Sequence, residues 1–222
     1  MEDHHIRAIQ ATTDYFAGQP EVKALLLGGS LAHGWARPAS DVDVLILVAP
    51  ADHAEREREG RLHFYSPALC AYPGGYVDGK YLSLDFLPQG AARGSEPARF
   101  AFQDAQVLFS RVPGLEAAVA AAACYPAAGM AERLARFYAQ FEAWHWFAHE
   151  GLRHANTYLL GVAVSKLTLF GGRLILTHNA LLFPYHKWFL AQLARAPRRP
   201  PGLLASLADL HATPSAVTVD AF

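Results

Sequence analysis

Two short polar segments, each beside an apolar run, carry residues suited to phosphate chemistry. Gly28, Gly29 and Ser30 follow the run 22–27, whose apolar character is typical of a buried strand. Two successive glycines permit a tight turn and let the backbone approach a ligand closely. The backbone N–H groups after such a turn can bind phosphate, above all where a helix begins. We therefore expect these three residues to hold the phosphates of a nucleotide.

Asp41 and Asp43 form the second segment, directly before the aliphatic run 44–48. Side chains two positions apart on an extended chain point to the same side. Two carboxylates held that close repel each other unless a cation lies between them. A divalent metal bound to nucleotide phosphates is the usual cation in such a site. The sequence therefore predicts a metal site next to the phosphate site.

The stretch 27–47 resembles the signature of the polymerase-beta-type nucleotidyltransferase superfamily. The signature is specific as a composite, whereas either half alone is a weak signal. The chain as a whole is most similar to small bacterial members, such as the aminoglycoside and lincosamide nucleotidyltransferases, which join this domain to a helical one. The matching residues are Gly28, Gly29, Ser30, Gly34, Ser40, Asp41 and Asp43.

The resemblance implies transfer of a nucleoside monophosphate from a nucleoside triphosphate, expected to be ATP, to a hydroxyl group. It also implies two Mg²⁺ ions and a third carboxylate on a neighbouring strand. Our candidate is Asp85, the only acid in the apolar segment 80–87. Asp78 competes with it, but its Val-Asp-Gly context favours a turn. Asp41, Asp43 and Asp85 are therefore the expected metal ligands and catalytic residues.

Further site residues also follow from the resemblance. Ser40 and Lys187 join the expected nucleotide-binding set, and His33 lies inside the glycine-turn motif, where it lines the nucleotide pocket or faces solvent. In the aminoglycoside enzymes a glutamate of the helical half acts as base for the drug hydroxyl. Glu142 and Glu150 are the candidates for that role here, with a solvated glutamate as the alternative for each.

The order of apolar patterns predicts an α/β (α+β) catalytic domain, a mixed sheet with flanking helices, followed by a C-terminal helical bundle. The expected domains are residues 1–115 and 128–222, with a boundary near 112–128. Strands are expected over 22–27, 44–48, 62–71, 81–87 and 103–109. Helices are expected over 3–16, 51–60, from 129, over 156–170 with Gly171 and Gly172 closing it, from 184, and over 203–210.

Composition narrows the class of protein further. With 222 residues, 52% of them hydrophobic and 18% charged, the chain is expected to fold. The net charge of −1 gives no support for binding nucleic acid. Cys70 and Cys124 are expected to be reduced, buried thiols of a cytoplasmic protein. The N-terminus shows no signal peptide, and the apolar stretch 117–125 is too short to span a membrane. The expected partners are a nucleoside triphosphate and a small-molecule or protein acceptor. A homodimer is the oligomeric state that we consider.

Three other functions compete with nucleotidyl transfer to a hydroxyl acceptor. A nucleotide-sugar glycosyltransferase also uses Asp-x-Asp, but there the pair follows a strand, whereas here it precedes one. A P-loop NTPase is excluded because the motif Gly-x-x-x-x-Gly-Lys-Ser/Thr is missing. An antitoxin-like nucleotidyltransferase that acts on or binds a partner protein stays open.

A pair of histidines, His145 and His149, lies four residues apart on an expected helix. This spacing can bind zinc, but no glutamate follows His145 directly, as a zinc protease would require. From the sequence we expect these histidines to be solvated or packed.

Overall fold

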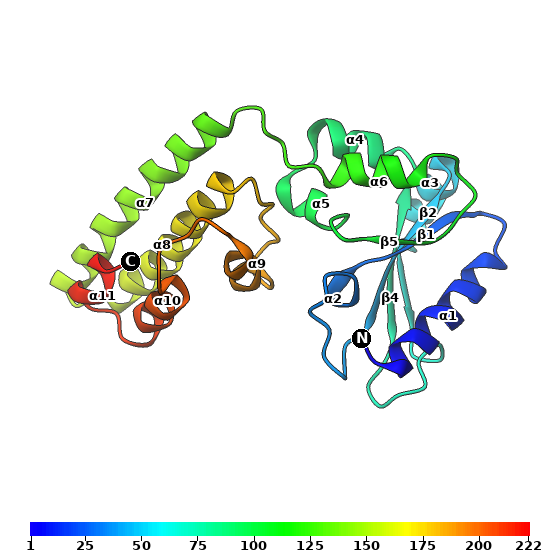
Figure 1. Ribbon diagram of the computed structural model, residues 1–222, viewed down its shortest axis with the longest axis horizontal. Helices are drawn as coiled ribbons and strands as arrows, with labels where there is room; N and C mark the ends of the chain where they lie inside the picture. The colour runs from blue at the N-terminus through cyan, green and yellow to red at the C-terminus, as the bar shows by residue number, and fades with distance from the viewer. The chain divides into compact units, whose positions relative to one another are not determined.

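The computed structural model describes all 222 residues and divides into two compact units, Met1–Cys124 and Tyr125–Phe222. The N-terminal unit contains a five-stranded sheet with helices, whereas the C-terminal unit is helical (Figure 1). Each unit is described here by itself.

The sheet of the N-terminal unit is mixed, with the strand order β3-β4-β2-β1-β5. Only β2 and β4 are parallel, and the other neighbouring strands are antiparallel. This mixed sheet with flanking helices confirms the predicted fold class. The strands are β1 (Val22–Leu27), β2 (Val42–Val48), β3 (His63–Ser66), β4 (Val77–Ser83) and β5 (Gln106–Ser110).

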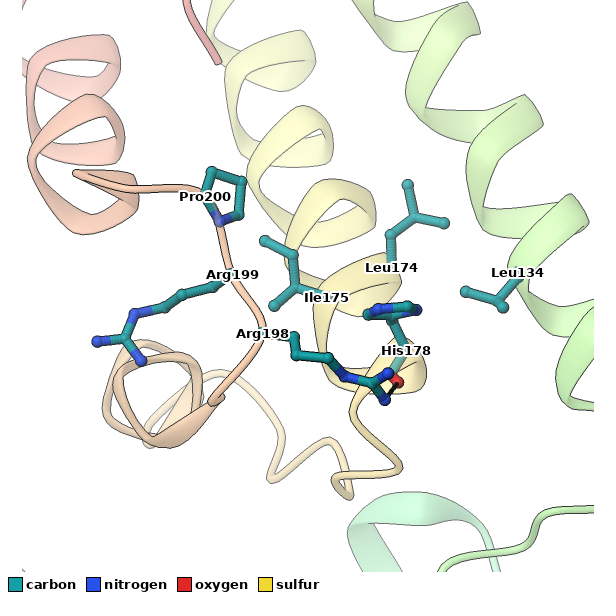
Figure 2. Close-up of a pocket in the computed structure, with 7 residues that line it drawn as sticks. All are labelled: Leu134, Leu174, Ile175, His178, Arg198, Arg199 and Pro200. Carbon is teal, nitrogen blue, oxygen red and sulfur yellow. Dashed lines mark hydrogen bonds between the residues drawn. The ribbon is translucent and has the colours of Figure 1, made fainter.

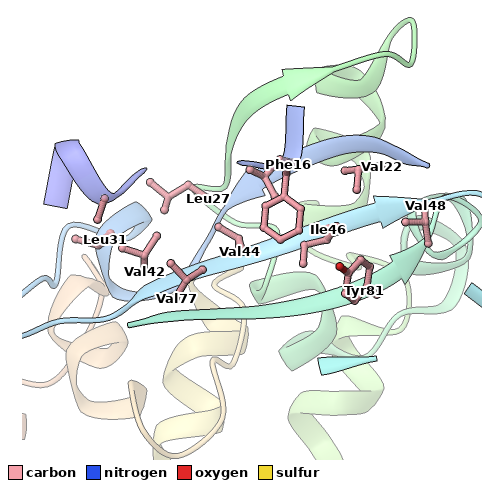
Figure 3. Close-up of a cluster of buried hydrophobic side chains, with 12 residues drawn as sticks. Phe16, Val22, Leu27, Leu31, Val42, Val44, Ile46, Val48, Val77 and Tyr81 are labelled. Atoms are coloured by element: carbon pink, nitrogen blue, oxygen red, sulfur yellow. The ribbon is translucent and has the colours of Figure 1, made fainter. Parts of the chain in front are cut away.

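Both faces of the sheet are covered, so the central strands are almost continuously apolar. Val44 and Ile46 face a cluster that contains Phe16, and Figure 3 shows the Phe16 ring among the side chains of this cluster. Leu47 faces the opposite cluster, which includes Leu115. The helices of this unit are α1 (Asp3–Ala17), α2 (Gly29–Ala32), α3 (Pro50–Arg58), α4 (Phe86–Arg93), α5 (Glu96–Phe100) and α6 (Leu115–Ala123).

The strand expected over 81–87 lies earlier in the chain, so that prediction is wrong in position. Strand β4 begins at Val77, directly after the turn that closes at Gly75, and ends at Ser83. Pairing with β2 explains the shift, because Val77 and Tyr81 then enter the same cluster as Val42 and Ile46. Strand β3 is likewise shorter than the expected 62–71.

The C-terminal unit is built on two long helices that pack along each other and are joined by the short connection 154–156. At this end the helices approach closely, since a Cβ added at Gly151 would lie 2.9 Å from the backbone nitrogen of Leu160. The helices are α7 (Met130–Arg153), α8 (Thr157–His178), α9 (Phe189–Arg195), α10 (Leu203–Ala212) and α11 (Ala216–Asp220).

Gly171 and Gly172 lie inside α8, so the prediction that they end this helix is wrong. Their role is to make room for aromatic rings. A Cβ at Gly171 would lie 2.8 Å from Cζ of Phe222, and a Cβ at Gly172 would meet the ring of Phe189 at 2.3 Å. Because packing supplies the stabilisation, α8 continues through two residues of low helix propensity. The helix expected from residue 184 begins only at Phe189.

Helix α8 is long and apolar enough to cross a membrane by length and composition alone. That test is also passed by core helices, and α8 contributes buried residues such as Leu167 and Leu176 to both clusters of its unit. The length and composition of α8 are therefore weak evidence for a membrane span.

The prediction of two buried thiols fails for Cys124, which is exposed, while Cys70 is half-buried.

Replacing Phe16 by alanine should destabilise the protein by about 3–5 kcal/mol, because the fully buried ring leaves a cavity against the sheet. The matched control is Ile6→Ala on the same helix, where the side chain is 54% exposed and the expected change is within about 0.5 kcal/mol. Urea unfolding followed by far-UV circular dichroism measures both. Equal midpoints for the two variants would contradict this account of the core.

Candidate functional site

The antiparallel pairing of β1 with β2 brings the glycine turn to Asp43. Leu27 at the end of β1 pairs with Val44 near the start of β2. The next residue, Gly28, donates its backbone N–H to the carbonyl oxygen of Asp43 at 2.9 Å. Helix α2 begins at the following residue, Gly29. The two sequence motifs are thus joined through the ladder of a single strand pair.

Gly29 lies directly against the carboxylate of Asp43. Its φ is +59°, a conformation that favours glycine, and a Cβ built on it would lie 1.7 Å from Oδ2 of Asp43. No side chain fits in that space. The second glycine of the motif is therefore required both by backbone conformation and by the close approach of the turn to the acid.

The parallel pairing of β2 with β4 places Asp78 beside Asp43. These two residues are partners in the register, on strands that lie about 4.8 Å apart. Both point to the face opposite Val44, the face on which Leu45 and Leu82 pack. Asp78 is therefore the carboxylate that lies next to Asp43 on the adjacent strand.

Asp41 joins the same group through Tyr76. The pKa of Tyr76 is raised, chiefly because its hydroxyl group hydrogen-bonds to Asp41, and the negative charges of Asp78 and Asp43 add to the effect. One phenol thus interacts with all three carboxylates. We refer to Asp41, Asp43 and Asp78 as the acidic cluster, in which Asp43 and Asp78 are neighbours across the strand pair and Asp41 is linked to them through Tyr76.

The predicted third acid, Asp85, lies elsewhere. It is exposed at the N-cap of α4, beyond the end of β4, and not within a strand as expected. In the register with β2, Ser83 pairs with Val48, at the far end of the strand pair. The five residue steps from Asp78 to Ser83 alone span roughly 16 Å. The structure does not bring Asp85 to Asp41 and Asp43.

A signal for Asp78 was present in the sequence. The turn 72–75 ends just before it, and Val77, Gly79 and Tyr81 alternate with Asp78 and more polar neighbours. Gly79 made the segment resemble a turn, but in the structure it packs inside the strand, where a Cβ would meet Ile46 at 2.8 Å.

The two serines of the signature have different surroundings. Ser30 is 5% exposed, and its Oγ is buried without a hydrogen-bond partner. A buried hydroxyl group normally has a partner, so this one is suited to a ligand oxygen. In contrast, Oγ of Ser40 accepts a hydrogen bond from the backbone N–H of Arg37 at 2.8 Å. Ser40 therefore orders the loop that leads to Asp41.

His33 is buried and does not face solvent. Its ring stacks on Phe100, with the centroids 4.5 Å apart, and its Nδ1 lies 3.1 Å from Oδ2 of Asp104. It follows the last residue of α2 and fixes the end of that helix against the segment 100–104. These contacts of His33 therefore help to hold α2 in place, and with it the glycine turn at which the helix begins.

The remaining predicted residues belong to the C-terminal unit. Lys187 is exposed, with its Nζ 5.2 Å from the ring centroid of Trp188. Glu142 is also exposed and accepts a hydrogen bond from the hydroxyl group of Tyr138 at 2.5 Å, which raises the pKa of that tyrosine. Glu150 pairs with Arg153 at 2.6 Å, so Glu142 is the more accessible carboxylate.

A pocket of about 460 Å³ lies within the C-terminal unit. Figure 2 shows Arg198 beside His178, with the Arg199 side chain directed away from it, and the guanidinium of Arg198 donates to the carbonyl of His178 at 2.8 Å. The positive charge of Arg198 disfavours a polycationic ligand. The lining residues are Leu134, Leu174, Ile175, His178, Arg198, Arg199 and Pro200.

Comparison with known families covers the glycine turn and the first two acids of the site. Residues 14–68 match the family model described as a nucleotidyltransferase domain, a range that holds the glycine turn, Asp41 and Asp43. The N-terminal unit therefore carries a nucleotidyltransferase domain, and membership of the polymerase-beta-type superfamily is confirmed. A domain of this class transfers nucleoside monophosphates.

The solved structure of a nucleotidyltransferase-like protein from Exiguobacterium sibiricum 255-15 is similar over 96% of this chain and 73% of its own, with a TM-score of 0.48 and 12% identity. No curated protein sequence matches the chain.

Replacing Gly29 by alanine should weaken divalent-metal binding at the cluster, because the new Cβ displaces the Asp43 carboxylate. Gly34→Ala is the matched control, since Gly34 has a φ of +73° and open space around its Cβ position. Both variants should lose about 1–2 kcal/mol of stability from backbone strain. Mn²⁺ titration monitored by electron paramagnetic resonance should show weakened binding in Gly29→Ala only. Equal affinities in the two variants would contradict the close approach of the turn to Asp43.

Proposed function

We propose that the protein is a Mg²⁺-dependent nucleotidyltransferase that transfers the nucleoside monophosphate of an NTP, ATP in the first instance, to a hydroxyl acceptor. The observation that carries this proposal is the contact between the Gly29 turn and Asp43, with Asp78 in register on the adjacent strand. It combines a phosphate-binding turn with a cluster of carboxylates on one face of a sheet.

The residues of the cluster fit the metal. Mg²⁺ prefers carboxylate and phosphate oxygens, and Asp41, Asp43 and Asp78 supply the carboxylates. Asp43 and Asp78 are neighbours across the strand pair, and two carboxylates that close favour a cation between them. When bound, Mg²⁺ would polarise the reacting phosphate and stabilise the developing charge on the attacking and leaving oxygens.

The glycine turn would position the triphosphate. The first N–H groups of α2 have no partners within the helix, so those of Gly29 and Ser30 are free to donate to phosphate oxygens. The buried hydroxyl group of Ser30 would add one more donor. Most of the rate acceleration would come from fixing the α-phosphate beside the carboxylates in a set geometry.

Asp78 takes the role of the third carboxylate, for which Asp85 is the candidate from the sequence alone. One of its oxygens, Oδ1, lies 3.0 Å from Nε2 of His63, so its side chain is oriented by a neighbouring strand. An oriented carboxylate beside the metal site is suited to accept the proton of the acceptor hydroxyl. Pyrophosphate would leave from the side of the glycine turn.

The acceptor is a small molecule or a protein that carries a hydroxyl group. The net charge of −1 and the arginines of the C-terminal pocket disfavour polycationic drugs such as aminoglycosides. Glu142 is the candidate base if the acceptor is a small molecule, and Lys187 is the candidate cation for the triphosphate. We place the reaction in the cytoplasm, in line with two reduced cysteines.

Asp78→Asn should lower turnover on the order of 100-fold or more with little change in NTP affinity, because one carboxylate of the cluster is lost. Asp85→Asn is the matched control and should retain the wild-type rate, since Asp85 is exposed at the far end of β4. The measurement is transfer from labelled ATP, GTP or UTP with Mg²⁺ to a panel of lincosamides, aminoglycosides and co-purified proteins.

Two results would contradict the proposal. One is transfer that persists in excess EDTA or in Asp43→Asn. The other is loss of activity in Asp85→Asn with full activity in Asp78→Asn, which would restore the assignment made from the sequence. A nucleotidylated partner protein without any modified drug would identify a protein acceptor.

A further inference from the structure

Three metal-ligating side chains meet in the C-terminal unit, in a place that the transferase chemistry does not use. His145 and His149 lie on α7, and Asp220 is the last residue of α11. Oδ1 of Asp220 lies 3.0 Å from Nε2 of His145 and 2.8 Å from Nε2 of His149. One ligand atom from each of the three residues lies within 4.8 Å of the others.

We propose that His145, His149 and Asp220 form a zinc site. Two imidazole nitrogens and one carboxylate oxygen are a donor set that Zn²⁺ accepts, with water in the fourth position. In a tetrahedral site with bonds of about 2.0–2.1 Å, ligand atoms lie roughly 3.3–3.4 Å apart. The present nitrogen–oxygen distances are shorter by about half an ångström, which small side-chain rotations would recover.

The fold holds these ligands in place independently of a metal. A spacing of four residues sets both imidazoles on one face of α7, and their ring centroids are 4.8 Å apart. Asp220 is positioned by a separate set of contacts, because a capping box of Ser215 and Thr218 opens α11 and Val219 is buried behind it. The site is therefore preorganised from two elements that are far apart in sequence.

The site is open enough for a metal and a water molecule to enter. The side chains of His145, His149 and Asp220 are 38%, 30% and 58% exposed. Trp146 occupies the position where a zinc hydrolase would carry its glutamate base, so the residues present favour a structural role over hydrolysis.

The metal would tie the C-terminal segment to α7. Phe222 lies two residues after Asp220, and its ring packs on Phe141 and fills the space left by Gly171. Zinc bound at Asp220 would therefore stabilise the aromatic contact of Phe222 with α7 and α8. This inference is independent of the proposed function, because all of its residues lie in the C-terminal unit.

The test is Zn²⁺ titration by isothermal calorimetry of the full-length, EDTA-treated protein in an Asp43→Asn background, which weakens the catalytic metal site. We expect one Zn²⁺ per chain and a rise in melting temperature on zinc binding. His149→Ala and Asp220→Asn should each raise the zinc Kd about 100-fold or more. This increase is larger than the one expected from losing a residue that only hydrogen-bonds to a metal ligand. His154→Ala, an exposed histidine one turn away, should bind zinc as the parent does.

Circular dichroism confirms that each variant is folded before titration. The proposal is overturned if the parent binds no zinc, or if His145→Ala/His149→Ala takes up zinc with the parent's affinity. It is also overturned if Asp220→Asn lowers the melting temperature equally in EDTA and in zinc, since the three residues would then form only a hydrogen-bonded clamp.

Discussion

The approach of Gly29 to the carboxylate of Asp43 is the constraint on which the rest of the catalytic unit depends. It exists because β1 runs antiparallel to β2, so that the end of one strand meets the start of the other. A Cβ at Gly29 would overlap Oδ2 of Asp43, so the contact requires glycine and a left-handed backbone at this residue. Burial of both sheet faces then fixes the register, since a slip of one residue would turn Asp43 into the core. The glycine turn and the acid are thereby held as one unit.

The parallel pair β2 and β4 extends this constraint to the third carboxylate. In that register Asp78 stands beside Asp43, and Tyr76 interacts with both of them and with Asp41. Repulsion between the neighbouring carboxylates of Asp43 and Asp78 favours a divalent cation at this position. Hydrogen-bonded strands set the positions of these two side chains, whereas Asp41 lies directly before β2.

The glycine turn, Asp41 and Asp43 could be predicted from the sequence, because these residues lie within one local signature. The fold class and the superfamily followed from it and are confirmed. The errors concern pairings that a local pattern does not encode. The Val-Asp-Gly context of Asp78 is typical of a turn and favours Asp85, whereas strand pairing makes Gly79 a core position. Gly171 is typical of a helix end, but in the structure it accommodates the ring of Phe222, which lies fifty-one residues later. The meeting of His145 and His149 with Asp220 likewise depends on tertiary contacts of α11.

The central claim is that the metal site contains Asp43 and Asp78 and excludes Asp85. Paramagnetic broadening by substoichiometric Mn²⁺ in the NMR spectrum of the labelled protein tests it most directly, because the effect falls steeply with distance from the ion. The account predicts strong broadening of the backbone amides of Gly29, Asp43 and Asp78, with the amide of Asp85 much less affected. Broadening of Asp85 while Asp78 stays sharp would contradict it.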